Sequence, residues 1–205
     1  MTVAMKGMTE LVFVLDRSGS MFNLVDDTVG GYNALVEANR ALGGNAVVST
    51  VLFNEAPTVL HDRVPIEQVP RMERADFRAS GCTALLDAVG FALWRTEFVQ
   101  SVLPAEHRAE HVLVAIATDG MENASFHYDY PQVKRMIEAA QRRGWEIVFM
   151  AANIDVTAEA SRLGIRADRA MAYTPSPAGT REMFDEVCCA CAQMRTEGDL
   201  DGWAQ

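Results

Sequence analysis

Two aspartates that directly follow apolar runs are the residues of this sequence best suited to binding a ligand. Asp16 ends the run ELVFVLD and opens the packet DRSGS, while Asp119 ends the run HVLVAIATD. The hydroxyls of Ser18 and Ser20 accompany the first aspartate, and Thr83 lies in a third polar segment, ASGCTAL. Carboxylate and hydroxyl oxygens, without thiolate or imidazole, are the ligands of a hard cation such as Mg²⁺, Mn²⁺ or Ca²⁺. The sequence therefore predicts a divalent cation site if the three segments meet.

The segments that must position these residues alternate between two patterns. Short valine-rich apolar runs predict buried strands, and apolar residues at steps of three and four predict helices. The expected strands are 10–16, 46–54, 56–64, 111–119, 145–153 and 169–174. The expected helices are 22–42, 83–103, 131–144, 155–164 and 176–198, the last with Ser176 as N-cap and Pro177 as first helical residue.

This alternation predicts an α/β fold, a Rossmann-like doubly wound and mainly parallel sheet with helices on both faces. The runs 46–54 and 56–64 are close enough to form a hairpin, so one edge strand is expected to be antiparallel. Ligands of such sheets bind beyond the carboxyl ends of the strands, where both aspartates are expected. The 205 residues, 49% of them hydrophobic, fit a single domain spanning 1–205.

The three polar segments also resemble a known family. DRSGS resembles the DxSGS signature of the von Willebrand factor type A (vWA) domain, and GCTAL and TDG resemble its second and third metal-binding loops. The resemblance implies a metal-ion-dependent adhesion site (MIDAS), in which Ser18, Ser20 and Thr83 ligate the ion while Asp16 and Asp119 bind it directly or through water. It further implies a partner protein that supplies an Asp or Glu carboxylate. The chain looks closest to the stand-alone intracellular members of bacteria and phages.

Other polar and aromatic residues are expected at the same edge of the sheet. Arg17, at the variable position of the signature, could steer an acidic partner, although a solvated arginine is the alternative. Asp87 lies one turn beyond Thr83 and could hold a hydroxyl or water near the ion, or be an exposed or capping residue. The segment after Asp119 supplies candidate partner contacts, about half of which are expected to cover the helix below instead; they are Glu122, Asn123, Phe126, His127, Tyr128 and Tyr130.

The composition limits which classes of partner and which cellular compartments are expected. A net charge of −10 and a pI near 4.8 argue against binding nucleic acid or an anionic membrane by counterion release. No apolar run approaches the roughly 18 residues of a membrane span. The apolar run in the first ten residues is too short for a signal peptide. Four cysteines without zinc or disulfide spacing are expected to be reduced thiols, those in MFDEVCCACAQM packing a helix against the core. We therefore expect a cytoplasmic location.

Enzyme signatures are weak by comparison. HRAEH (107–111) matches the HxxEH zinc-protease pattern, but the strand expected from residue 111 argues against the helix that this motif needs. A metal-dependent hydrolase or phosphoryl-transfer enzyme at the same acidic edge is the alternative function, with Glu122 or His127 as general base. A third possibility is an adaptor subunit that binds its partner without metal. The residues favour metal-dependent protein binding without catalysis.

Overall fold

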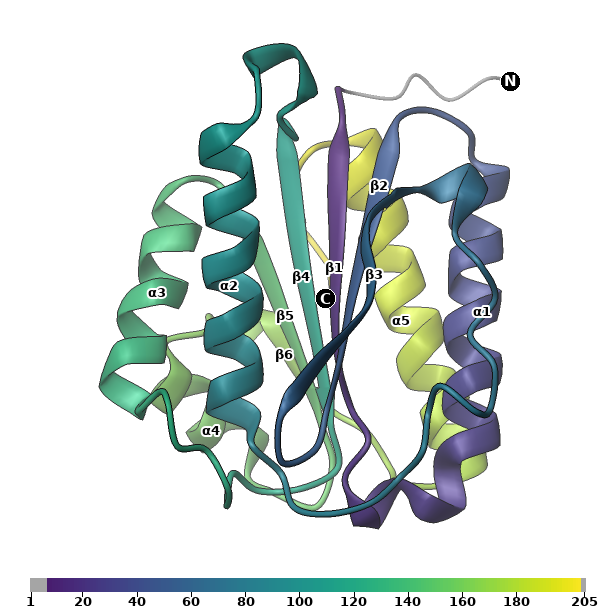
Figure 1. The fold of residues 1–205 in the computed structure, drawn as a ribbon, viewed down its shortest axis with the longest axis vertical. Helices are drawn as coiled ribbons and strands as arrows, with labels where there is room; N and C mark the ends of the chain where they lie inside the picture. The colour runs from purple at the N-terminus through teal and green to yellow at the C-terminus, as the bar shows by residue number, and fades with distance from the viewer. Residues whose placement is uncertain (1–6, 204–205) are drawn as a thin grey trace.

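In the computed structural model, which describes residues 7–203, the described strands form one sheet in the order β3-β2-β1-β4-β5-β6 (Figure 1). Their bounds are β1 (Thr9–Asp16), β2 (Ala46–Phe53), β3 (Pro57–Pro65), β4 (His111–Thr118), β5 (Glu146–Ala151) and β6 (Ala170–Ala172). Every neighbouring pair is parallel except β2 and β3, which form the expected antiparallel hairpin at one edge. The predicted fold class is confirmed.

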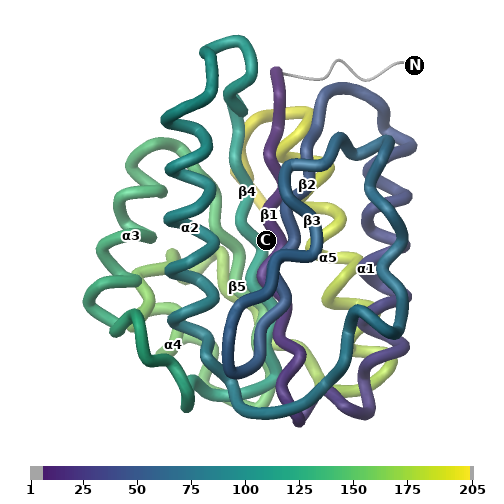
Figure 2. Tube along the Cα trace, in the orientation of Figure 1, coloured from purple at the N-terminus to yellow at the C-terminus, as the bar shows by residue number. Residues whose placement is uncertain are grey.

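Helices cover both faces of this sheet (Figures 1 and 2). The helices α1 (Val25–Ala41) and α5 (Pro177–Thr196) pack together on one face, while α2 (Leu85–Val102), α3 (Tyr130–Arg142) and α4 (Val156–Leu163) lie on the other. Alternate residues of β1 serve the two cores: Leu11, Phe13 and Leu15 pack towards α1 and α5, and Val12 and Val14 towards α2. Such burial on both faces is the reason why the central strands read as continuous apolar runs.

The helix ends follow the sequence signals, with one correction. The Ser176 hydroxyl accepts a hydrogen bond from the backbone N–H of Gly179 at 3.1 Å, as predicted, and the Asp155 carboxylate caps α4 in the same way. Gly43 follows α1 with a φ of +69°, which suits a glycine. The helix predicted from residue 22 begins instead at Val25, because a 3₁₀ helix, η1 (Gly19–Leu24), joins it to the end of β1.

The helix that carries three of the cysteines packs largely as predicted. Phe184, Val187, Cys191 and Met194 of α5 are buried against the sheet and α1, whereas Cys188 is half-buried and Cys189 is exposed. All four thiols are free, and none of the helices within residues 7–203 is long and apolar enough to cross a bilayer.

Candidate functional site

The loops after β1 and β4 meet at the lower edge of the sheet in Figure 1. Because β1 and β4 are neighbouring parallel strands, their carboxyl ends place Asp16 and Asp119 side by side. The Ser20 hydroxyl donates a hydrogen bond to the Asp119 carboxylate across the two loops. The Ser18 and Ser20 hydroxyl oxygens lie 3.1 Å apart, and the Ser18 backbone N–H donates to Asp16 Oδ1 at 2.7 Å. Two carboxylates and two hydroxyls therefore form one polar cluster.

Thr83 belongs to the same cluster. A Cβ atom placed on Gly120 would lie 3.4 Å from the Thr83 hydroxyl oxygen and 3.9 Å from that of Ser20. The Thr83 side chain is buried beside them. The structure thus brings together all five residues that the sequence assigns to the metal, from three separate loops.

The electrostatics of this cluster are unusual for a protein interior. Asp16 is 1% exposed and Asp119 is 3% exposed, yet among the described residues neither forms an ion pair with Lys, Arg or His. Burial raises the pKa of both carboxyls, and hydrogen bonds from Thr118 to Asp16 and from Ser20 to Asp119 lower the pKa values in part. The negative charge of Asp119 further raises the pKa of Asp16. The site concentrates negative charge that no basic side chain of residues 7–203 neutralises.

Three further residues lie around the cluster: Thr118 and Tyr173, which the sequence did not single out, and Asn153, which follows a strand expected to end at this edge. The Thr118 hydroxyl donates to Asp16 Oδ2 at 2.6 Å, and the Asn153 amide donates to the Asp119 carbonyl at 3.0 Å. Tyr173 directly follows β6, and burial together with the charges of Asp119 and Asp16 raises the pKa of its hydroxyl. One available signal was that Thr118 and Asn153 lie at the carboxyl ends of strands flanking the site.

Glu122 has a structural role that the sequence did not reveal. Its carboxylate accepts hydrogen bonds from the backbone N–H groups of Leu86, Ala124 and Ser125, and from the Ser125 hydroxyl at 2.7 Å. These bonds fold the loop onto the first turn of α2. The structure thus gives Glu122 the role of holding this loop, and its predicted role as a partner contact or general base stays a prediction.

Asp87 and Asn123 fix the rest of this loop. Asp87 accepts hydrogen bonds at 2.8–2.9 Å from the backbone N–H groups of Phe126, His127 and Tyr128. This is the capping role that the sequence left open beside a contact with a hydroxyl or water near the ion. Asn123 Oδ1 accepts from the Thr83 backbone N–H at 2.9 Å, and the Asn123 N–H donates to the Thr83 carbonyl at 3.0 Å. Asn123 thus positions the loop that carries Thr83, and its contact with a partner stays a prediction.

The remaining predicted residues divide between surface and support. Arg17 points away from the aspartates: its guanidinium donates to the Thr58 hydroxyl at 3.0 Å and to the Asp76 carbonyl at 3.2 Å. Tyr128 covers α2, because a Cβ on Gly90 would lie 2.6 Å from its ring. His127 is exposed and packs edge-to-face with the ring of Phe126 at 5.4 Å. The HRAEH segment forms a 3₁₀ turn and the start of β4, which is not the helix that a zinc protease needs.

The donor set fits a hard divalent cation. No cluster of three or more His, Cys, Asp or Glu side chains suited to a metal occurs in residues 7–203, so the oxygens beyond two carboxylates come from hydroxyls. Uncharged hydroxyls leave a bound ion electron-poor, and oxygen ligands suit Mg²⁺, Mn²⁺ or Ca²⁺ better than softer metals.

No protein-family model matches the chain, and neither does any curated protein. Among solved structures, the von Willebrand factor domain of the type V pili tip protein Mfa5 from Porphyromonas gingivalis is similar, at 11% identity and a TM-score of 0.63, over 96% of this chain and 99% of that one. A von Willebrand factor type A protein from Catenulispora acidiphila is 18% identical with a TM-score of 0.59, over 90% of this chain and 43% of that one.

A mussel protein adds chemical context. Proximal thread matrix protein 1 from the mussel byssus, with a zinc-occupied MIDAS motif, is 18% identical with a TM-score of 0.59, over 90% of this chain and 46% of that one. The chain likewise spans 46% of that protein in another crystal form and 62% of the PilB minor pilin from Streptococcus sanguinis. At these identities the comparisons establish architecture, and the chain has the fold of von Willebrand factor type A domains.

Proposed function

We propose that this chain is a divalent-metal-dependent protein-binding domain. The observation that carries the proposal is the pair of buried aspartates, Asp16 and Asp119, that face each other among hydroxyls without a basic side chain of residues 7–203 paired to them. Two buried negative charges are costly unless a cation neutralises them. Ser18, Ser20 and Thr83 surround the aspartates with hydroxyl oxygens, which is why Mg²⁺ is our first choice of ion, with Mn²⁺ or Ca²⁺ as alternatives.

The partner chemistry follows from the charge of the donor set. A divalent ion held by two carboxylates and neutral hydroxyls would attract a further anionic oxygen, such as that of an Asp or Glu side chain of another protein. The chain's own residues hold the three loops in place: Thr118 and Asn153 fix the strand ends, and Asn123 fixes the Thr83 loop. Such a site binds without needing a general base, and Glu122 is occupied by backbone donors.

Similar folds in known proteins support this proposal. The mussel byssus protein carries zinc in its MIDAS motif, and the pilus adhesin SpaC from Lactobacillus rhamnosus is another similar structure, at 13% identity and a TM-score of 0.67 over 92% of this chain and 31% of that one. Because several of these proteins belong to pili, the cytoplasmic location and the bacterial or phage origin of this chain remain predictions.

Calorimetric titration with MgCl₂ and MnCl₂ tests the metal half of the proposal. We expect one site per chain, and a loss of affinity of at least about 100-fold in Asp119→Ala, because removing one of two carboxylates halves the charge that holds the ion. Asp185→Ala, which removes an exposed carboxylate of α5, is the matched control and should bind as the native protein does. Absence of any heat at millimolar metal in the native protein would refute the proposal.

Affinity capture tests the partner half. The immobilised native protein, incubated with extract of its source cells in Mg²⁺, should retain a partner that is released by chelator and is not retained by Asp119→Ala. Capture that ignores both chelator and the Asp119→Ala substitution would identify a metal-independent adaptor instead.

A further inference from the structure

An open cleft beside the candidate site has walls that the proposed metal site does not use. The cleft has a volume of about 650 Å³ and lies between the β2–β3 turn, α2 and the loop after Asp119. We call it the aromatic cleft; it is lined chiefly by Glu55, Pro57, Phe91, Trp94, Phe126 and Tyr128. Trp94 is 49% exposed and Phe126 is 89% exposed, so large rings face solvent here.

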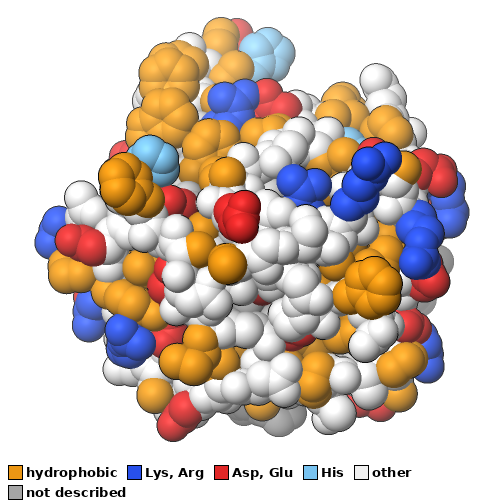
Figure 3. All heavy atoms as spheres, turned by 60° about the horizontal axis from the view of Figure 1, so that its bottom comes forward, with side chains coloured by type: hydrophobic (Ala, Val, Ile, Leu, Met, Phe, Trp, Pro, Cys, Tyr) orange, Lys and Arg blue, Asp and Glu red, His pale blue; other side chains and the backbone are white. Residues whose placement is uncertain are grey.

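The exposed rings continue along α2 as a stripe. The Phe91 and Trp94 ring centroids are 6.3 Å apart, and the Trp94 and Phe98 rings stack at 5.8 Å, within 15° of parallel. Val102, one turn further on, is 62% exposed. Figure 3 shows hydrophobic side chains gathered on the side of the molecule where α2 lies. Contiguous exposed apolar surface of this kind marks interaction sites, and tryptophan and other aromatic residues dominate binding energy in protein interfaces.

The aromatic cleft and the metal loops share their supports. Asp87 holds the backbone of Phe126 and Tyr128 on the rim of the cleft, and Asn123 in the same loop holds Thr83. On the opposite wall, the carboxyl carbon of Glu55 lies 3.0 Å from the position of a Cβ on Gly81, two residues before Thr83. A partner segment that reached the metal site would therefore lie directly beside the cleft.

The aromatic cleft and the metal site differ in charge and therefore suit different chemical groups. The residues that line the cleft include Glu55 and Asp87 and neither Lys nor Arg, so the cleft does not attract a carboxylate. Its aromatic walls suit an apolar side chain, whereas the metal site suits an anion. This complementarity selects a partner segment that carries both groups.

We propose that the aromatic cleft receives a large apolar side chain, aromatic or leucine, from the same protein segment that supplies a carboxylate to the metal site. This inference rests on the proposed function, and it adds the second determinant of partner recognition. The ion alone would accept any accessible Asp or Glu, and the cleft restricts binding to acidic residues with an apolar neighbour.

Selection from a peptide library tests this inference. Capped octapeptides with one fixed central Asp and all other positions randomised are selected on the native protein in Mg²⁺. We expect the enriched peptides to carry Trp, Phe, Tyr or Leu at one recurring distance from the Asp. The affinity of the best peptide should fall at least about tenfold in Trp94→Ala and in Phe126→Ala. Leu42→Ala, which removes an exposed apolar side chain that follows α1 and does not line the cleft, is the matched control and should bind within about twofold of native.

Separate measurements distinguish the two proposals. The Trp94→Ala protein should bind Mg²⁺ as the native protein does, while chelator or Asp119→Ala should abolish peptide binding. Failure to recover any peptide, enrichment without an apolar preference, or an apolar preference that persists in Trp94→Ala would each overturn the inference, while native Mg²⁺ binding would leave the proposed function intact. Self-association of the native protein that Trp94→Ala abolishes, seen by sedimentation, would assign the cleft to a second copy and overturn the inference too.

Discussion

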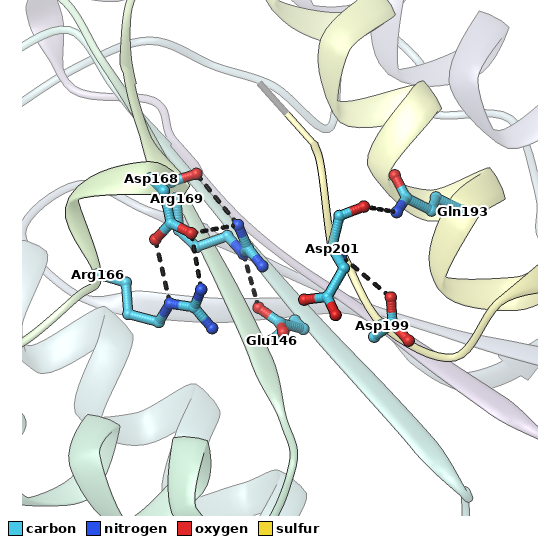
Figure 4. Close-up of polar contacts among 7 residues, drawn as sticks. All are labelled: Glu146, Arg166, Asp168, Arg169, Gln193, Asp199 and Asp201. Carbon is cyan, nitrogen blue, oxygen red and sulfur yellow. Dashed lines mark hydrogen bonds and ion pairs between the residues drawn. The ribbon is translucent and has the colours of Figure 1, made fainter. Parts of the chain in front are cut away.

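At the upper edge of the sheet, where β1 and β5 begin, the buried carboxylate of Glu10 and the half-buried carboxylate of Glu146 each face an arginine. Glu10 of β1 is 1% exposed and pairs with Arg63, and Gln100 also donates to it, at 2.6 Å. Glu146 of β5 pairs at 2.8 Å with Arg169, whose side chain is 2% exposed. Figure 4 shows this second pair with the Asp168 carboxylate on the other side of Arg169. The same figure shows Asp201 of the C-terminal segment, whose carbonyl accepts from Gln193 of α5.

At the lower edge, Asp16 ends the same strand that contains Glu10 and is equally buried, but it faces hydroxyls and a second aspartate. One strand therefore carries two buried acids whose pKa values are both raised by burial; the charge of Arg63 counters this effect at Glu10, whereas the charge of Asp119 adds to it at Asp16. At the Glu10 end, Arg63 neutralises the buried carboxylate, so this end needs no cation from solution. The Asp16 end lacks its positive partner within residues 7–203, which is the property expected of a site that recruits a cation from solution.

Breaking the ion pair between Glu10 and Arg63 should have the largest effect on the free energy of unfolding. Glu10→Ala leaves the Arg63 guanidinium, which is 14% exposed, without its carboxylate, and should lower the free energy of unfolding by about 3–5 kcal/mol. Urea unfolding followed by circular dichroism measures it. Glu37→Ala breaks the solvent-exposed pair with Arg40 and should cost under about 1 kcal/mol. Equal costs for the two variants would mean that burial at the upper edge does not matter as we argue.

Removing one negative charge at the lower edge should change the free energy of unfolding in the opposite direction. In chelator, Asp119→Asn keeps an acceptor for the Ser20 hydroxyl and relieves repulsion with Asp16, so the variant should be as stable as the native protein or more stable. Mg²⁺ at 100 times its Kd should add about 2.7 kcal/mol to the native protein and nothing to the variant. Urea unfolding with and without metal measures both, with Asp185→Asn as the control that responds like native. A loss as large as that of Glu10→Ala would show that the two edges do not differ.

Much of this arrangement was predictable because it depends on local patterns. Buried strands and the helices between them appear as apolar runs and steps of three and four, and the carboxyl ends of parallel strands share one edge of the sheet, where both aspartates were expected. The direct adjacency of β1 and β4 is a feature of the strand order that the structure shows. The hydroxyls of Ser18 and Ser20 follow Asp16 in sequence, so their proximity needed no tertiary information.

The loop after Asp119 was not predictable to the same degree. The contacts of Glu122 and Asp87 with backbone N–H groups join segments about 40 residues apart, and a carboxylate that binds backbone looks in sequence like one that binds a partner. Arg17 poses the same problem, since its acceptors at Thr58 in β3 and Asp76 in a loop are distant in sequence. The η1 turn also escaped prediction, because its residues suit either a 3₁₀ turn or the first turn of a helix.

The smallest predicted effect is a pH-dependent loss of folding stability caused by the buried charge of Asp119 at the lower edge. Burial raises the pKa of folded Asp119 above its unfolded value of about 3.9, so the folded state takes up a proton before the unfolded state does. In chelator, the native protein should therefore be less stable than Asp119→Asn above the folded pKa of Asp119. The deficit, on the order of 1 kcal/mol, should shrink as the pH falls through that pKa and vanish near the unfolded value. Parallel urea titrations of both proteins between neutral and acidic pH measure this difference. A deficit that grows on acidification would require a lowered pKa for Asp119, and hence a positive partner that this edge of the sheet was argued to lack.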